Sequence, residues 1–284
     1  MEIIATMPHT IIKVSRLQVR EQEDELAMEE PLQIQLQLNT ASGRINKNIA
    51  VTMRTPGQDS QLAAGFLFTE GIISNKDQVS YILHVNNEEN RIVVALKEGI
   101  TALLHNTQRN FYTTSSCGVC GKTSIDAIKT VAVYNNEEPA FPVAASTFYL
   151  LQHQLLRQQE LFESTGGLHA AALFDLDGNF LTLKEDVGRH NALDKLIGDA
   201  MLNDQLPLTN KILLLSGRIS FELVQKAIMA GVKIVAAVGA PSSLAVELAQ
   251  ENNMTLIGFL RQEKFNIYCG AHRINYTNET KNKR

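Results

Sequence analysis

Residues 211–260 read KILLLSGRISFELVQKAIMAGVKIVAAVGAPSSLAVELAQENNMTLIGFL, and they give the clearest indication of the fold class. Short apolar runs alternate here with helical patterns, and Gly, Ser or Pro residues separate them. The runs predict strands at Lys211–Leu215, Val232–Val238 and Thr255–Leu260, and the helical patterns predict helices at Phe221–Ala230 and Leu244–Glu251. Because strands that alternate with helices form parallel sheets through right-handed crossovers, this half of the chain is expected to fold as a layered α/β domain.

The first third of the chain shows the shorter period of strands. Leu32–Leu38 alternates apolar and polar residues, turn residues follow, and alternation resumes over Ile45–Met53, which predicts a hairpin. Further along, the patterns predict a helix that begins at Asp59 or Ser60 and strands at Val79–Val85 and Arg91–Leu96. We therefore expect residues 1–110 to form a smaller, mixed α+β segment that is rich in strands and paired antiparallel.

The middle of the chain lacks a buried stripe. Residues 111–122 read FYTTSSCGVCGK, and these small polar residues and glycines predict a mobile loop. Helices are predicted at Thr123–Val131 and Thr147–Phe162, and Asp175–Gly178 predicts a hairpin turn. The α/β domain is thus expected over residues 123–276, followed by a polar tail at 277–284.

The overall composition excludes several classes of protein. With 284 residues, 44% of them hydrophobic, and a net charge of −4, the chain matches an ordinary globular protein. Broad binding to nucleic acid is not expected, because it requires a surplus of Lys and Arg. No apolar run approaches the roughly 20 residues of a spanning helix. Met1–Lys13 lacks a secretory pattern, and the 3 cysteines fit a reducing compartment, so a cytoplasmic location without membrane contact is expected.

Cys117 and Cys120 form the first candidate site. Two residues separate them, glycines flank them, and a predicted helix follows whose positive end, together with Lys122, favours the thiolate. A reactive thiol pair is therefore one interpretation. The alternatives are a zinc site completed by Cys269 and His272, a thioredoxin-like redox pair, and two structural cysteines.

A second cluster, Glu185-Asp-Val-Gly-Arg-His-Asn191, places two carboxylates, a guanidinium, an imidazole and an amide close together in sequence. Such a density indicates either a ligand site or a buried polar network, and the residues alone favour neither. His169 follows Thr165-Gly-Gly167 at the start of a predicted strand. By itself, a histidine in this position is more often satisfied within the core than used for chemistry.

Two strand-to-helix junctions, Leu215-Ser-Gly-Arg218 and Val238-Gly-Ala-Pro-Ser-Ser243, give a third signal. In doubly wound sheets, ligands bind beyond the carboxyl ends of strands, and the N-termini of helices suit phosphate. Arg218 adds a planar donor for an anion. Neither junction is a Walker loop or a dinucleotide fingerprint, and ordinary turn chemistry is the alternative.

Six stretches of this sequence, in this order, carry a resemblance to a known family. They are Ala64-Gly-Phe-Leu-Phe-Thr-Glu-Gly-Ile72, Ser116-Cys-Gly-Val-Cys-Gly121, Thr165-Gly-Gly-Leu-His-Ala-Ala171, Glu185-Asp-Val-Gly-Arg-His-Asn-Ala-Leu-Asp-Lys195, Leu215-Ser-Gly-Arg218 and Leu256-Ile-Gly-Phe259. Together they resemble the FdhD family of formate dehydrogenase accessory sulfurtransferases, and the resemblance spans about residues 30–274.

The resemblance implies a homodimer that accepts sulfane sulfur from a cysteine desulfurase. It implies transfer of that sulfur to molybdenum bis(molybdopterin guanine dinucleotide), for which GDP is an analogue, before the cofactor enters formate dehydrogenase. It also implies a larger domain similar to the cytidine deaminase fold. Cys117 is implied as the persulfide carrier and Cys120 as its partner, without a metal. The alternative is a molybdenum-cofactor chaperone whose two cysteines bind zinc.

The resemblance also implies where the cofactor binds. The family's binding segment falls on Phe259, Leu260, Arg261, Gln262, Glu263 and Lys264, and the further expected contacts are Ser216, Arg218, Gly239, Ser242, His169 and Arg189. Gln262 and Glu263 depart from the glycine-containing sequence that is common in the family, and Cys269 is treated as incidental. Ala171 stands where a zinc deaminase has its glutamate, two residues after the histidine, so deamination is not expected.

Overall fold

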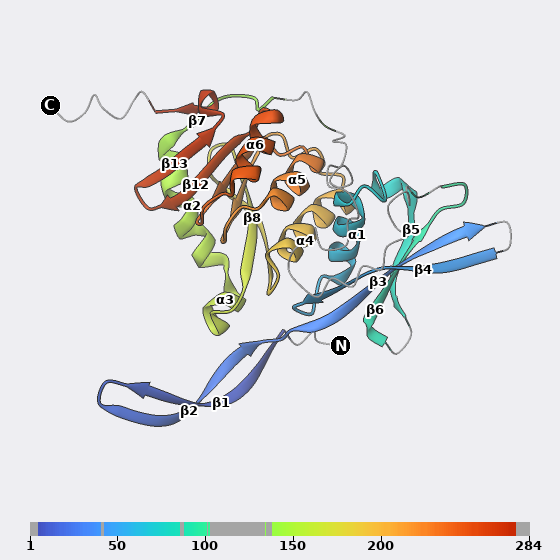
Figure 1. Cartoon of the computed structure of the whole chain (residues 1–284), viewed down its shortest axis with the longest axis horizontal. Coiled ribbons are helices and arrows are strands. Elements are labelled where there is room, and N and C mark those ends of the chain that lie inside the picture. The colour runs from blue at the N-terminus through green and yellow to red at the C-terminus, as the bar shows by residue number, and fades with distance from the viewer. Residues whose placement is uncertain are drawn as a thin grey trace.

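The structure of the protein, a computed structural model, describes residues 5–40, 43–85, 88–100, 102, 134 and 138–276. The loop predicted at 111–122, the helix predicted at Thr123–Val131 and the tail predicted at 277–284 lie outside these residues. Figure 1 shows two sheets with helices packed between and around them, and a two-stranded arm that extends away from both.

The largest sheet has six strands in the order β13-β12-β11-β10-β8-β9. Their bounds are β8 His169–Asp175, β9 Phe180–Asp186, β10 Lys211–Leu215, β11 Ile234–Ala237, β12 Thr255–Arg261 and β13 Lys264–Cys269. β10, β11 and β12 are parallel, as the alternating pattern predicts. The remaining strands join the sheet antiparallel: β8 and β9 form the hairpin predicted at Asp175–Gly178, and β13 is the second strand of a hairpin that follows β12.

Helices cover both faces of this sheet (Figure 1). α4 (Arg189–Leu202), α5 (Phe221–Met229) and α6 (Ser243–Glu251) pack on one face, and α2 (Ala145–Gln158) packs on the other. Because side chains of a strand alternate between faces, Leu213 of β10 belongs to the first apolar cluster and Leu214 to the second. No described helix is long and apolar enough to cross a membrane.

The helix predicted at Thr147–Phe162 is two helices. Gln159 interrupts it with a ψ of 75°, which is not helical, and α3 (Glu160–Thr165) begins there. The backbone N–H groups of Leu161 and Phe162 donate to the Glu185 carboxylate at 3.2 and 3.0 Å. These bonds satisfy two donors of the new first turn. The break depends on a residue far away in the sequence, so helical periodicity alone did not reveal it.

The first third of the chain forms a four-stranded sheet ordered β4-β3-β6-β5. Its strands are β3 Glu30–Thr40, β4 Gly43–Arg54, β5 Val79–Val85 and β6 Glu88–Leu96. The β3–β4 hairpin, the two later strands and α1 (Asp59–Thr69) confirm the predicted elements, but β3 and β6 pair parallel rather than antiparallel. Asp59 does not cap α1, because it is the first residue of the helix and its carboxylate accepts from the buried Arg54. The residue before the helix is Gln58, which has a φ of 57°.

α1 crosses α4 with the two backbones in contact. A Cβ atom on Gly65 would lie 1.9 Å from the carbonyl oxygen of Asp194, and one on Gly198 would lie 1.9 Å from that of Gln61. Glycine is therefore required at both positions. This close approach makes one apolar cluster continuous from β3 to β10, so the smaller sheet packs onto the α/β layers through α1.

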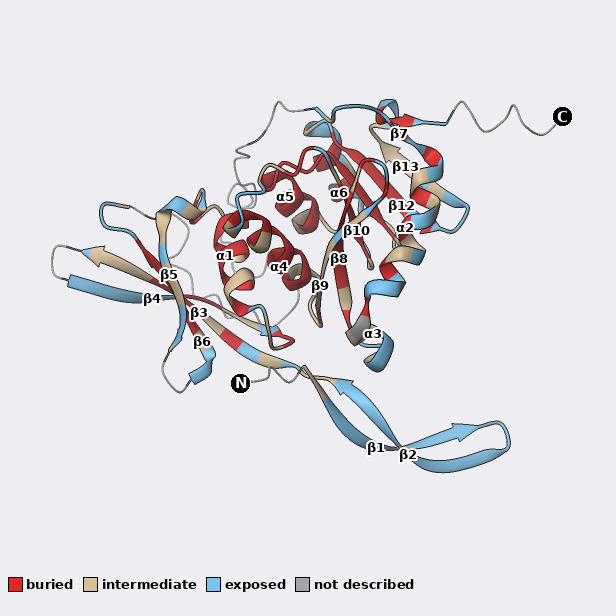
Figure 2. Cartoon of the chain, turned by 180° about the vertical axis from the view of Figure 1, so that it is seen from behind, coloured by how far each residue is buried: buried red, intermediate tan, exposed pale blue. Residues whose placement is uncertain are grey.

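The arm consists of β1 (Thr6–Ser15) and β2 (Gln18–Ala27), which pair with each other. Figure 2 shows it exposed along most of its length. Its apolar residues are also exposed, and Leu17 at the turn is 96% accessible. The sequence did not predict these strands, because neither face is buried against a core and the residues therefore show no apolar period.

Candidate functional site

The loops that follow β10 and β11 lie side by side at the carboxyl ends of the strands, where ligands bind in sheets of this kind. The Gly239 N–H donates to the Gly217 carbonyl at 3.0 Å, and the Ile219 N–H donates to the Ala240 carbonyl at 3.0 Å. A Cβ atom on Gly239 would lie 2.6 Å from the Gly217 oxygen. The close packing of the two loops therefore requires glycine at position 239. The two predicted junctions together form one wall at the ends of the strands, which we call the strand-end wall.

Beside this wall lies a cavity of about 350 Å³ that His169 and Ser216 line, and we call it the His169 cavity. The residues that make its apolar walls come from α2, from α3 and from positions that border β8 and β11, and they are Leu155, Leu156, Phe162, Leu168 and Val238. The Ala170 N–H donates to Ser216 Oγ at 2.8 Å and holds that hydroxyl in place. Apolar walls with a few fixed polar groups suit an organic ring better than a bare ion.

His169 is a neutral imidazole at physiological pH. Burial lowers its pKa, and the positive charges of Arg189 and Arg218 lower it further, while Asp186 acts in the opposite direction. The structure therefore brings three of the predicted site residues, His169, Arg189 and Arg218, into one electrostatic environment.

Two more predicted contacts on the strand-end wall differ in what they can offer a ligand. Arg218 is exposed, and none of the described carboxylates forms an ion pair with its guanidinium. Ser242 is the N-cap of α6, and its Oγ accepts a hydrogen bond from the Ala245 N–H at 3.3 Å. Arg218 is free to bind an anion, whereas the Ser242 oxygen already has a structural role.

Phe259, near the end of β12, has an unusual backbone. Its φ of 54° lies in the left-handed region, which costs a residue other than glycine about 1–2 kcal/mol. Its N–H donates to the Gly239 carbonyl at 3.0 Å, so the strand-end wall imposes this conformation. The side chain is 44% exposed. Strain of this kind is frequent where a side chain is presented to a ligand.

The rest of the predicted binding segment divides between core and surface. Leu260 is fully buried, so its side chain contacts the core and not a ligand. Arg261 Nη1 donates to the Val238 carbonyl at 2.8 Å, which fixes the guanidinium against the strand-end wall. Gln262 and Glu263 are exposed in the turn between β12 and β13.

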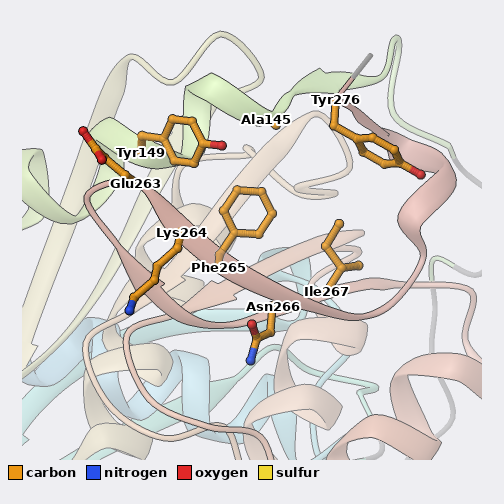
Figure 3. A pocket seen from close by; sticks show the side chains of 8 residues that line it. All are labelled: Ala145, Tyr149, Glu263, Lys264, Phe265, Asn266, Ile267 and Tyr276. Carbon is orange, nitrogen blue, oxygen red and sulfur yellow. The ribbon is translucent and has the colours of Figure 1, made fainter. Parts of the chain in front are cut away.

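Glu263 and Lys264 line a second hollow, an open groove of about 660 Å³ beside α2. Figure 3 shows Phe265 and Ile267 on one side of β13, and Lys264 on the other. The rings of Phe265 and Tyr149 are 5.9 Å apart. The groove and the His169 cavity share no lining residue, so the structure does not gather all of the predicted contacts in one hollow.

The Glu185–Asn191 cluster is largely a buried polar network. Asp186 is fully buried and accepts from Lys195 Nζ at 2.7 Å, from the Thr55 N–H at 3.2 Å and from Asn191 Nδ2 at 3.0 Å. These bonds join the end of the β4 hairpin to the start of α4. Of the two interpretations that the sequence left open, the buried network describes Asp186 and Asn191.

His190, in the same cluster, is also neutral. Its Nε2 lies 3.3 Å from Ser220 Oγ. Burial lowers its pKa to about 4, with a further contribution from the Lys226 charge, although Glu222 acts in the opposite direction. An imidazole with this pKa packs between α4 and α5 without a charge.

Cys117 and Cys120 lie outside the described residues, so the thiol pair stays a prediction. Cys269 is half-buried in β13, and its Sγ donates to the Met254 carbonyl at 3.3 Å. Burial raises the pKa of this thiol, which disfavours the nucleophilic thiolate. Within the described ranges, no group of three or more His, Cys, Asp or Glu side chains is arranged to hold a metal ion.

The FdhD/NarQ family model matches residues 27–275. This chain belongs to the FdhD/NarQ family. A family member from Mycolicibacterium paratuberculosis, named sulfur carrier protein FdhD, is 49% identical over 256 residues, which cover 88% of this chain and 91% of that protein. A protein of the same name from Streptomyces avermitilis is 45% identical over 272 residues, 93% of this chain and 94% of its own. The family match begins at the last residue of β2, so nearly all of the arm precedes it.

A solved structure shares the fold of this family member. It is that of a candidate formate dehydrogenase accessory protein from Desulfotalea psychrophila, with a TM-score of 0.73 and 22% identity. The match covers 96% of this chain and 100% of the other. The similarity confirms the mixed α/β class, while the likeness to the cytidine deaminase fold stays a prediction.

One residue of the His169 cavity was not predicted from the sequence. Gln159 lines the cavity and is 2% exposed, and its Nε2 has no hydrogen-bond partner. The sequence did contain a signal for this residue. Gln159 stands four residues after the buried Leu155, at a position where the apolar stripe of α2, if continued, predicts another apolar side chain.

Proposed function

We propose that this chain carries sulfur for formate dehydrogenase. It takes a sulfur atom from a cysteine desulfurase as a persulfide on Cys117 and delivers it to molybdenum bis(molybdopterin guanine dinucleotide), its cargo. The strongest support is the 49% identity, over 88% of the chain, with a protein named sulfur carrier protein FdhD. The cysteine pair within Ser116–Gly121 supports the persulfide step. The proposal includes a cytoplasmic homodimer, as the family resemblance implies.

The sulfur steps balance as two exchanges. The Cys117 thiolate attacks the outer sulfur of the desulfurase persulfide, the S–S bond breaks, and the desulfurase cysteine leaves as a thiolate. Cys120 then attacks the Cys117 sulfur, which releases sulfide to the molybdenum and leaves a disulfide between the two cysteines. A cellular dithiol reduces this disulfide before the next cycle.

We propose that the guanine dinucleotide part of the cargo binds along the strand-end wall. Arg218 is exposed without an ion-pair partner among the described carboxylates, and Phe259 is exposed in a strained conformation. Arg261 and Lys264 are exposed on the neighbouring hairpin and add positive charge for phosphates. Gly239 permits the loops to pack, and Ser242 caps α6, so both shape the wall more than they bind.

Sulfur loading tests the first step. The protein is incubated with a cysteine desulfurase and cysteine, and its intact mass is measured for an added sulfur atom. We expect the adduct in the wild type and in Cys269→Ala, because the Cys269 thiol is half-buried with a raised pKa. Cys117→Ala should lack it. An unchanged adduct in Cys117→Ala excludes that residue as the carrier.

GDP titration tests the binding of the cargo. Arg218→Ala should lower the affinity about tenfold or more, because hydrogen bonds to a charged group contribute about 1.5–3 kcal/mol. Arg44→Ala is the matched control, since Arg44 is an exposed arginine on β4 of the other sheet. Equal affinity in the Arg218→Ala and Arg44→Ala variants rules out a phosphate contact by Arg218.

A further inference from the structure

The side chain of Gln159 is buried at a cost that the fold alone does not explain. It lies at the break between α2 and α3, is 2% exposed, and leaves Nε2 without a hydrogen-bond partner. A buried donor that has lost water and gained no partner destabilises a protein. A leucine would fill the same space without that cost. The position therefore favours a polar side chain for a reason outside the folded chain itself.

The other unsatisfied group nearby is also a donor. Among the described residues, only Gln159 Nε2 and Arg189 Nε are buried side-chain nitrogen or oxygen atoms without a partner. The charge of Arg189 is close enough to lower the pKa of His169, which lines the same cavity as Gln159. Ser216 Oγ accepts from the Ala170 N–H, so its own proton is left to donate. The cavity thus contains a donor that lacks an acceptor, and a fitting ligand must supply at least one acceptor.

The size and walls of the His169 cavity define the rest of that ligand. About 350 Å³ accommodates one fused ring and not a whole dinucleotide. The apolar side chains of Leu155, Phe162 and Val238 suit the faces of such a ring. An acceptor on the ring edge, such as a ring carbonyl, satisfies the buried amide. Adenine carries an amino group in place of that carbonyl and would set a donor against a donor.

We propose that the His169 cavity binds the aminooxopyrimidine edge of a fused ring, with Gln159 Nε2 donating to the ring carbonyl. Guanine and pterin share this edge, so the chemistry of the cavity fits either half of the proposed cargo. The inference rests on the proposed function and assigns Gln159 as the residue that selects an oxo ring over an amino ring.

Calorimetric titration of GDP, ADP and a free hydroxymethylpterin tests this assignment with the full chain. Gln159→Leu should weaken GDP or the pterin about tenfold, the worth of one hydrogen bond that a buried donor depends on, and leave ADP unchanged. The matched control is Gln158→Leu, because Gln158 is the exposed neighbour that does not line the cavity. The ligand-free Gln159→Leu protein should melt no lower than the wild type, since it loses an unsatisfied donor.

The titrations test the role of Gln159 and the proposed function separately. Weakening of GDP alone identifies guanine as the ring in the cavity, and weakening of the pterin alone identifies the pterin. If the wild type binds these ligands and Gln159→Leu binds them equally well, or loses ADP to the same extent, the role of Gln159 is refuted while the proposed function stands. If the wild type binds neither GDP nor the pterin, the proposed function fails together with this inference.

Discussion

Lys195→Met should destabilise the protein by about 3 kcal/mol. Lys195 is 2% exposed, and its Nζ contacts Asp186 Oδ2 at 2.7 Å, the Thr55 carbonyl at 2.9 Å and the Glu185 carbonyl at 3.3 Å. Methionine keeps the apolar stem but leaves the buried carboxylate without a cation, which costs about 3–5 kcal/mol. The lower end applies, because Asp186 keeps three neutral donors from Thr55, Gly188 and Asn191.

Urea denaturation followed by circular dichroism measures this loss. Lys97→Met is the matched control, because Lys97 is exposed and should change the free energy of unfolding by less than about 0.5 kcal/mol. Adding Asp186→Asn to Lys195→Met should recover part of the loss, since an amide needs no cation. A Lys195→Met protein within about 1 kcal/mol of the Lys97→Met control would refute the network as a stabilising contact between the two sheets.

Three further perturbations test other parts of the structure. Gly65→Ala should cost about 3 kcal/mol in urea denaturation, since its Cβ would lie 1.9 Å from the Asp194 oxygen, whereas Gly167→Ala, with its nearest neighbour 3.9 Å away, should be near neutral. The pKa of His190 falls from 6.5 to about 4 on folding, so the unfolded chain binds more protons between these values. Stability should therefore fall by about 2–3 kcal/mol as the pH drops through that window, and His190→Gln should flatten the pH dependence. Phe259→Gly should be about 1 kcal/mol more stable than Phe259→Ala, because both lose the ring and only glycine relieves the positive φ; equal stability contradicts strain at this residue.

Local periodicity predicted the elements whose environment is uniform. β5 and β10 have the predicted bounds, because each is an apolar or alternating run that ends at clear turn residues. Pairing was harder to predict. The parallel contact of β3 with β6 depends on which strand edge is free after the β3–β4 hairpin forms, and the residues of a strand do not encode that choice. The arm was missed for the opposite reason, since exposure on both faces removes the apolar period.

The sequence indicated which residues belong to the region of the candidate site, but it did not indicate the role of each residue. The density of polar groups in Glu185–Asn191 marked an important region, but only tertiary partners on β4 show that Asp186 and Asn191 are satisfied internally. Gln159 gave the reverse case. In the sequence it is only a polar residue within the apolar stripe of a predicted helix. Its significance appears only when α2, α3 and the start of β8 enclose a cavity around it.

The difference between satisfied and unsatisfied polar groups separates scaffold from ligand site in this fold. The start of α4 shows both kinds within a few residues. Asp186 has a bond for each oxygen, so a ligand there would have to break contacts that the fold needs. Arg189 follows three residues later with a buried Nε that has no partner, and its charge acts on His169 at the cavity. The satisfied network fixes where the unsatisfied donors stand, and rigid donors lose little entropy when an acceptor arrives. A helix start that anchors one sheet to the other can therefore also position a binding group beside the strand ends.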